Sequence, residues 1–151
     1  MAKMTVKSTV GGKISDVIGE YLEEIPLDVI DEMLTAEADV IEPMIEANAK
    51  TMLDGKYSEG ITAKSLTRKD PETYKGKNSS GQRQIALTFK GTRENGKKRK
   101  RNAEVAFINE YGSRRTAARP FIQKAIDTGS EKAFGEAEKV FDKWLENNMK
   151  K

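Results

Sequence analysis

Hydrophobic residues recur at helical intervals in two long stretches, one in each half of the chain. Between residues 28 and 53, apolar side chains return every three or four positions, and alanines fill several places between them. Residues 120–150 carry the same period. Because a repeat near 3.6 residues places apolar side chains on one face of a helix, both stretches predict long amphipathic helices. A shorter stretch, residues 14–25, predicts a short helix by the same spacing.

Two features interrupt these helical patterns. Pro43 lies inside the first stretch and removes a backbone hydrogen bond at a cost of ~3 kcal/mol, so we expect a kink or a restart there. Residues 127–130 are polar and include a glycine, which predicts a break in the second helix. Three methionines, Met33, Met44 and Met52, form a stripe that we interpret as core filling in preference to an adaptable partner groove.

The middle of the chain predicts one clear strand and one long loop. Residues 84–89 alternate between polar and apolar side chains, which is the pattern of a half-buried strand. Residues 55–82 contain few apolar side chains and many turn-forming residues, and they predict a long loop. Within that loop, only residues 60–66 carry apolar side chains suited to dock on the core.

Residues 90–101 form the most basic part of the chain. Asn95-Gly96 is a strong signal for a hairpin turn, and the returning segment Lys97–Arg101 consists entirely of cations. If the returning segment is a strand, its lysines discourage further pairing at a sheet edge. If it is a loop, it is a flexible basic finger. The sequence leaves both alternatives open.

Residues 102–111 fit a strand period in part, but they favour a short helix. Asn102 is a suitable N-cap, and Gly112 is suited to end a helix in a left-handed conformation. Four apolar side chains share one face of this expected helix: Ala103, Phe107, Ile108 and Tyr111. A polar loop, residues 113–119, separates it from the last helix, which begins at Pro120.

The composition limits the chemistry available to the chain. Its 151 residues are 36% hydrophobic and 34% charged, which predicts one domain with a thin core and favours long loops or an oligomer. The absence of cysteine and histidine excludes disulfides, thiolate nucleophiles and the commonest general base. With no nucleophile motif, phosphate-binding loop or ligand cluster, we expect no enzyme, no cofactor and no metal site. No apolar run approaches the ~20 residues of a membrane span, so we expect a soluble protein made in a cytoplasm.

Charge is distributed unevenly along the chain. Residues 14–49 contain eleven acids and no lysine or arginine, whereas residues 90–101 contain seven basic residues and one acid. A chain polarised in this way could pair head-to-tail with copies of itself or present its basic segment to nucleic acid. Both segments are also compatible with ordinary solvated surface.

Two short motifs near the start of the last helical stretch carry the most distinctive pattern in the chain. The first is Glu110-Tyr111-Gly112, and the second is Pro120-Phe121. Together they resemble the paired signature of a tailed-phage family of minor tail, tail-completion or head–tail joining (neck) proteins. In that family an aromatic-rich segment ends in Glu-aromatic-Gly, and a Pro-Phe step opens the last helix.

The resemblance covers Asp28–Leu145 and agrees with the order of the expected elements. Residues 60–66 are a loose version of a Gly-Leu-Ser segment of the family, and the basic insert Lys97–Arg101 departs from the family pattern. The pattern and the resemblance together predict an α+β fold, with a long N-terminal and a C-terminal helix packed on a small antiparallel sheet with long loops. Residues 1–27 would form an arm and short helix, and residues 28–151 a single tail-completion-like domain.

The signature residues are expected to act as a scaffold. Tyr111 and Phe121 would bury together, Gly112 would turn the chain and Pro120 would start the last helix. Glu110 would either cap that helix or pair with a nearby arginine. None of these residues is expected to be catalytic, because a lone carboxylate has no partner acid, histidine or metal to work with.

The resemblance also implies partners and a location. It implies a virion protein at the neck or tail, assembled in the host cytoplasm as a ring, taken as a hexamer. The partners would be neck or connector proteins, tail terminator or tube proteins and DNA in the lumen, bound without sequence readout, with no membrane. The alternative is a stand-alone basic nucleic-acid-binding module. In either case the expected contact residues are Lys97, Lys98, Arg99, Lys100, Arg101, Arg114, Arg115 and Arg119.

Overall fold

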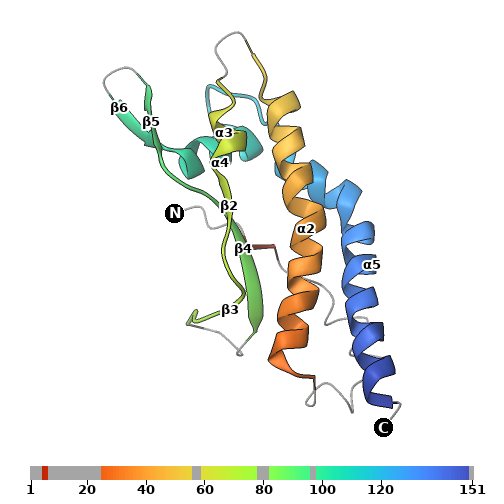
Figure 1. Cartoon of the computed structure of the whole chain (residues 1–151). Coiled ribbons are helices and arrows are strands. Elements are labelled where there is room, and N and C mark those ends of the chain that lie inside the picture. The colour runs from red at the N-terminus through yellow and green to blue at the C-terminus, as the bar shows by residue number, and fades with distance from the viewer. Residues whose placement is uncertain (1–4, 7–24, 56–58, 78–81, 96–97, 150–151) are drawn as a thin grey trace.

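The computed structural model describes most of the chain outside the N-terminal arm. The described residues are 5–6, 25–55, 59–77, 82–95 and 98–149. Two long helices run antiparallel beside each other, α2 (Leu27–Met52) and α5 (Phe121–Met149), and a small antiparallel sheet lies against α2 (Figure 1). The predicted α+β class is therefore confirmed. Apart from Ile25, the short helix predicted for residues 14–25 lies outside the described residues.

Small residues bring the two long helices close together. Ala125 and Ala133 of α5 are buried in the core that this helix shares with α2. Gly129 lies between them, and a Cβ at that position would lie only 2.6 Å from Sδ of Met44. Close packing thus outweighs the weak helix propensity of glycine. Helix α5 continues through residues 127–130, where the predicted break is wrong.

Helix α2 also runs without interruption through Pro43, so the predicted restart is wrong. Pro43 itself is exposed, where the carbonyl that loses its partner has access to solvent. The residues two positions to either side of it, Ile41 and Ile45, are both buried in the same core cluster. Burial on both sides of the proline holds the two halves of α2 in one helix.

The strand predicted for residues 84–89 is confirmed as β4 (Arg83–Phe89), which lies at the centre of the main sheet. On one side it pairs with β1 (Thr5–Val6), and on the other with β2 (Leu66–Arg68) and β3 (Glu72–Thr73). All three pairings are antiparallel. The apolar face of β4 is turned into the core, and its Ile85 and Leu87 are buried.

Residues 55–82 are not simply a loop, and this prediction was wrong. They contain α3 (Ile61–Lys64) as well as β2 and β3. These strands are too short to show a periodic pattern, and their structure depends on backbone pairing with β4. Leu66 packs against the main core, as expected from its apolar character.

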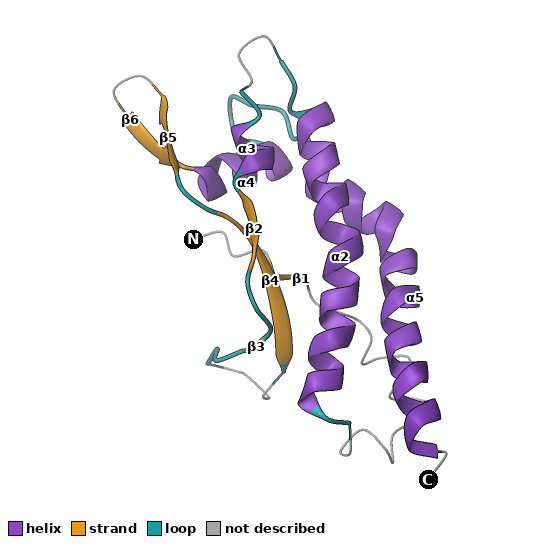
Figure 2. Cartoon of the chain, in the orientation of Figure 1, coloured by secondary structure: helices purple, strands orange, loops and turns teal. Residues whose placement is uncertain are grey.

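The basic segment is a β-hairpin, which resolves the alternative left open by the sequence. Strands β5 (Thr92–Asn95) and β6 (Lys98–Arg101) pair antiparallel and form a sheet of their own. Figure 2 shows this hairpin projecting away from the two long helices, with the short helix α4 (Asn102–Tyr111) at its base. The helix predicted for residues 102–111 is therefore confirmed.

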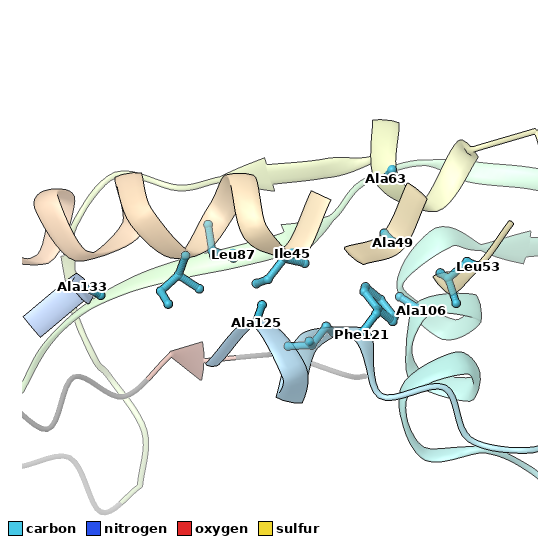
Figure 3. Close-up of a cluster of buried hydrophobic side chains, with 11 residues drawn as sticks. Ile45, Ala49, Leu53, Ala63, Leu87, Ala106, Phe121, Ala125 and Ala133 are labelled. Atoms are coloured by element: carbon cyan, nitrogen blue, oxygen red, sulfur yellow. The ribbon is translucent and has the colours of Figure 1, made fainter. Parts of the chain in front are cut away.

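The main core is centred where the start of α5 meets α2, α4 and β4 (Figure 3). Phe121 is 0% exposed, and its ring meets Phe89 edge-on with centroids 6.0 Å apart. A second cluster lies farther along the helix pair and includes Met33 and Phe141. Met33 is buried, and Met44 and Met52 pack against the main cluster, so the methionine stripe fills the core as interpreted from the sequence.

Candidate functional site

The connection between α4 and α5, here called the joint (residues 109–123), begins with an abrupt stop at Gly112. Its N–H donates to the carbonyl of Ile108 over 2.8 Å, and its backbone has φ 78° and ψ 179°. This combination is essentially restricted to glycine. A Cβ at Gly112 would also lie 2.9 Å from the backbone nitrogen of Ala118. The expected turning role of Gly112 is thus supported by both its conformation and its surroundings.

Glu110 caps the N-terminus of α5. Its Oε2 accepts the N–H of Ile122 and its Oε1 accepts the N–H of Gln123, both over 2.8 Å. These N–H groups belong to the first turn of α5, where no carbonyl of the helix can reach them. Glu110 is only 6% exposed and forms no ion pair with a described arginine. Of the two roles considered for Glu110, capping is confirmed.

Arg119 closes the joint through Asn109. The backbone N–H of Arg119 donates to the carbonyl of Asn109 over 2.6 Å, and its Nη2 donates to Oδ1 of Asn109 over 2.8 Å. The amide of Asn109 donates in turn to the carbonyl of Val105, over 2.9 Å. Asn48 of α2 adds a bond to the carbonyl of Phe121 at 3.0 Å. Arg119 therefore has an internal role, unlike Arg114 and Arg115.

Tyr111 is not buried with Phe121, so that prediction was wrong. Tyr111 is 69% exposed and Phe107 is 49% exposed, and their rings lie together with centroids 4.8 Å apart. We call these two residues the aromatic pair. Helix α4 instead buries polar residues, because Asn102, Asn109 and Glu110 are all satisfied by hydrogen bonds. On the predicted apolar face of α4, Phe107 and Tyr111 are exposed, and Ala103 and Ile108 are half-buried.

The hairpin is tied to the body at its base. Arg93 donates from Nε to Oδ1 of Asn102 and from Nη2 to Oγ1 of Thr62, both over 2.9 Å. Asn102 donates to the carbonyl of Lys90 over 2.7 Å. Asn102 is thus the first residue of α4 and a bridge to the hairpin, while Arg101 is the N-cap and its side chain makes no capping bond. The prediction of Asn102 as N-cap was wrong.

Partial burial changes the pKa of Arg93, the residue that links the hairpin to α3 and α4. Desolvation lowers the pKa of Arg93 from its ordinary value, and the nearby carboxylate of Glu59 partly opposes that shift. The guanidinium gives up some hydration in exchange for two directed hydrogen bonds. Neither Arg93 nor Asn102 was identified from the sequence as a site residue, because their partners lie in other segments.

Strand β6 of the hairpin consists of four cations. Lys98–Arg101 make no ion pair with any described residue, and Arg114 and Arg115 at the far end of α4 are equally free of one. Lys97 lies outside the described residues. Helix α4 therefore connects two groups of exposed cations, one before it and one after it, and carries the aromatic pair between them.

The acidic segment is partly neutralised inside the molecule. Asp31 of α2 pairs with Arg83 of the sheet at 2.5 Å, and this bond raises the pKa of Arg83. Arg68 pairs with Asp39 at 2.5 Å and with Glu42 at 3.2 Å. These bridges fasten α2 to the sheet. An open groove of about 430 Å³ runs beside them, lined by Asp28, Asp31, Glu32, Thr35, Ala36, Asp39 and Pro71.

Across the described ranges, no three or more acidic side chains are grouped so as to hold a metal ion. In the same part of the chain, no helix has the length and apolar character needed to cross a bilayer. Comparisons with protein-family models, with curated proteins and with solved structures gave no match for this chain.

Proposed function

We propose that this chain is a structural virion protein of a tailed phage or phage-like particle. In this proposal it is a ring subunit at the head–tail junction or the tail-proximal end, where it joins or completes the tail. The proposal starts from the resemblance of Glu110-Tyr111-Gly112 and Pro120-Phe121 to the signature of such proteins. It is supported by the order of elements, since a long helix, short strands, a helix ending at Gly112 and a long final helix follow one another.

The observation that carries the proposal is the exposed aromatic pair on a rigidly held helix. Phe107 and Tyr111 face solvent although Phe121, close by in sequence, is fully buried. Arg114 and Arg115 follow them directly in the chain, and both are exposed. Aromatic residues and arginine are enriched at the centres of protein interfaces, where they contribute much of the binding energy. The joint fixes this helix, so the surface is preorganised for a neighbour.

A ring also suits the distribution of features over the molecule. Rings are built from head-to-tail contacts between two different surfaces, which close if the rotation between subunits allows it. The aromatic pair and the cations lie together around α4, while the groove borders the first half of α2. Cations that reach the lumen of such a ring would contact phosphates without reading base sequence.

The first test removes the aromatic pair without disturbing the fold. Phe107→Ser with Tyr111→Ser should leave the thermal unfolding temperature within a few degrees of wild type, because both rings are largely exposed. Light scattering and negative-stain microscopy should show rings for the wild type and smaller species for the variant. Undiminished ring formation by this variant would remove the main support for the proposal. The control is Glu104→Ser, an exposed change on the same helix that should leave rings intact.

The second test asks whether the hairpin is needed in the particle. Replacing Lys98–Arg101 by serine is preferable to deleting them, because Arg101 directly precedes the first residue of α4. In the phage that encodes the chain, we expect unjoined heads and tails to accumulate while the purified variant stays folded. Normal virion yield from this variant would contradict the proposal. Portal and capsid genes just upstream of the coding sequence, with tail-tube genes downstream, would agree with it.

A stand-alone nucleic-acid-binding module is the second candidate, and one observation favours it. The hairpin is a two-stranded ribbon bearing four consecutive cations on β6, and a ribbon of this kind can enter the major groove of DNA. This candidate predicts that the isolated monomer binds short duplex DNA with a steep dependence on salt. A ring with weak DNA affinity favours the structural role instead.

A further inference from the structure

The hairpin and the groove lie toward opposite ends of the molecule. Figure 1 shows the hairpin projecting near the end where α2 finishes, whereas the groove borders the half of α2 that begins at the other end. They also carry opposite charge. Strand β6 consists of four cations, and four of the seven residues that line the groove are acids. The two surfaces of one molecule are too far apart in this arrangement to satisfy each other.

Both surfaces have charges left over after internal pairing. In the groove, Asp31 and Asp39 are bonded to Arg83 and Arg68, but Asp28 and Glu32 form no ion pair with a described residue. The cations of β6 are likewise without an ion pair in the described part of the chain. An excess of negative charge thus remains in the groove and an excess of positive charge on the hairpin.

The pairing register of the hairpin identifies its outward face. Lys100 lies opposite Arg93, and cross-strand neighbours share one face of a sheet. Because Arg93 is bonded to α3 and α4, this face is turned toward the body of the molecule. Arg99 and Arg101 are on the other face, since side chains alternate along a strand. The outward face therefore carries these two arginines, together with Glu94, which lies opposite Arg99 in the register.

The spacing of the two sets of charges also agrees. Residues two apart in a strand are separated by about 6.8 Å, which sets the distance between Arg99 and Arg101 along β6. Residues four apart in a helix share a face and are separated by about 6 Å along the axis, which sets the distance between Asp28 and Glu32. Guanidinium groups bind carboxylates through two parallel hydrogen bonds, so two arginines in register with two carboxylates make a specific contact.

We propose that the outward face of the hairpin of one copy docks in the α2 groove of the next copy. Arg99 and Arg101 then bind Asp28 and Glu32 in a head-to-tail contact. The occupant of the groove is a second copy of this chain, because complementary charges at matching spacing are present on one chain at opposite ends. A polyanion such as DNA would be repelled by the groove. The inference rests on the proposed function in that it names a contact by which the ring subunits join.

Charge reversal tests the contact in three steps. One variant carries Arg99→Glu and Arg101→Glu, and the other carries Asp28→Arg and Glu32→Arg. Each variant alone should self-associate about 100-fold more weakly than wild type in light scattering, because like charges then face each other. Mixing the two variants in equal amounts should restore assembly, since each altered surface meets its altered complement and each native surface meets a native one. A single chain carrying all four changes should also assemble.

Matched controls carry the same change of charge on α5. Lys132→Glu with Lys143→Glu matches the hairpin variant, and Glu131→Arg with Glu138→Arg matches the groove variant. All four residues are exposed, and none of them lines the groove. Both controls should assemble as the wild type does. If a charge-reversed variant fails to fold by circular dichroism, the neutral changes Arg99→Gln with Arg101→Gln, or Asp28→Asn with Glu32→Gln, replace it with a smaller expected loss.

The outcomes separate this inference from the proposed function. The hairpin–groove contact is wrong if rings form equally well with either reversed surface. It is also wrong if the mixture of the two variants fails to assemble. In both cases the chain could still be a ring subunit that joins its neighbours by another contact. Restored assembly in the mixture, together with normal virion yield after loss of the hairpin cations, supports the contact and overturns the role in the neck. If the reversed hairpin changes only salt-dependent binding to duplex DNA, the contact is wrong and the hairpin binds nucleic acid.

Discussion

The joint and the β5–β6 hairpin lie at opposite ends of α4, yet they use their polar groups in opposite ways. In the joint, Glu110 and Asn109 are buried, and each makes hydrogen bonds to the protein. In the hairpin, the side chains of β6 are mostly exposed and make no ion pair or side-chain hydrogen bond within the described residues. The polar side chains of the joint bond to other parts of the protein, whereas the cations of β6 are left free to interact with solvent or a partner.

Because of this difference, the joint mainly affects the stability of the protein, and the hairpin mainly affects its interactions. A buried polar group costs about 1–3 kcal/mol when its partner is lost, so each contact in the joint matters for folding. Exposed charges contribute on the order of 0–1 kcal/mol to stability and act mainly on encounter and partner choice. Changes in the joint should therefore lower the free energy of unfolding, and changes in the hairpin should alter what the protein binds.

The largest expected effect is at Phe121. Truncation by Phe121→Ala should lower the free energy of unfolding by about 3–5 kcal/mol, because the ring is 0% exposed and a cavity would remain beside Phe89. Urea denaturation followed by circular dichroism measures this loss. Tyr111→Ala is the control, since its exposed ring should cost less than about 1 kcal/mol. Similar losses for the two variants would contradict the division between a buried joint and an exposed aromatic pair.

A smaller loss is expected at Gly112. Gly112→Ala forces a side chain into a conformation that costs about 1–3 kcal/mol, and its Cβ would crowd the backbone nitrogen of Ala118. We expect a loss of about 2–3 kcal/mol in the same denaturation experiment. The control has the opposite sign. Gly135 lies inside α5 with open space around its Cβ position, so Gly135→Ala should stabilise the protein by about 0.5–1 kcal/mol.

The next largest loss of stability is expected at Glu110. Glu110→Gln keeps the shape of the side chain but replaces one accepting oxygen with an NH₂ group, which cannot accept the N–H of Ile122 or Gln123. One buried N–H is then left without a partner, and about 2 kcal/mol of stability should be lost. Glu104→Gln, an exposed acid on the same helix, should change stability by less than about 0.5 kcal/mol. Equal effects at the two positions would show that the cap contributes little.

Part of this joint could be predicted from the sequence, because its signals are local. The two long helices follow from apolar periodicity, and Gly112 and Pro120 mark a stop and a start by their backbone preferences. The capping role of Glu110 was one of two roles suggested by an acid placed before a helix. The fold class followed from the same patterns and is confirmed.

The buried face of α4 could not be predicted from hydrophobicity. Its buried residues include Asn102, Asn109 and Glu110, whose partners are Lys90, Arg93, Arg119 and the first turn of α5. Hydrogen bonds to other segments make a polar face suitable for burial, and they leave Phe107 and Tyr111 outside. A prediction that places the apolar side chains of α4 in the core therefore selects the wrong face of this helix.

The predictions of a loop at residues 55–82 and of interruptions in the two long helices were wrong for a related reason. β2 and β3 are defined by pairing with β4, which no pattern within residues 55–82 reports. Pro43 and Gly129 both weaken a helix in isolation. Gly129 lies where α2 and α5 pack closely, and Pro43 lies on the exposed face of α2 between buried residues. Tertiary contacts outweighed local propensity at both positions.

The smallest expected effect is at Arg93, where the hairpin is tied to the body. Arg93→Met removes two hydrogen bonds and leaves acceptors on Thr62 and Asn102, both of which are buried. Other contacts at the hairpin base remain, including the bond from Asn102 N–H to the carbonyl of Gly91. Because local opening of the hairpin lets water reach these two acceptors, we expect a loss of only about 1 kcal/mol in global stability, with faster amide hydrogen exchange confined to β5 and β6.

Arg93→Lys sharpens this last test, because it keeps the charge but loses the planar fork that reaches two acceptors at once. If directed hydrogen bonds hold the hairpin, exchange in β5 and β6 should be nearly as fast in Arg93→Lys as in Arg93→Met. If charge alone matters, Arg93→Lys should behave as the wild type. Faster exchange that spreads into α5 in either variant would contradict the comparison, since it would mean that the hairpin contributes to the stability of the joint.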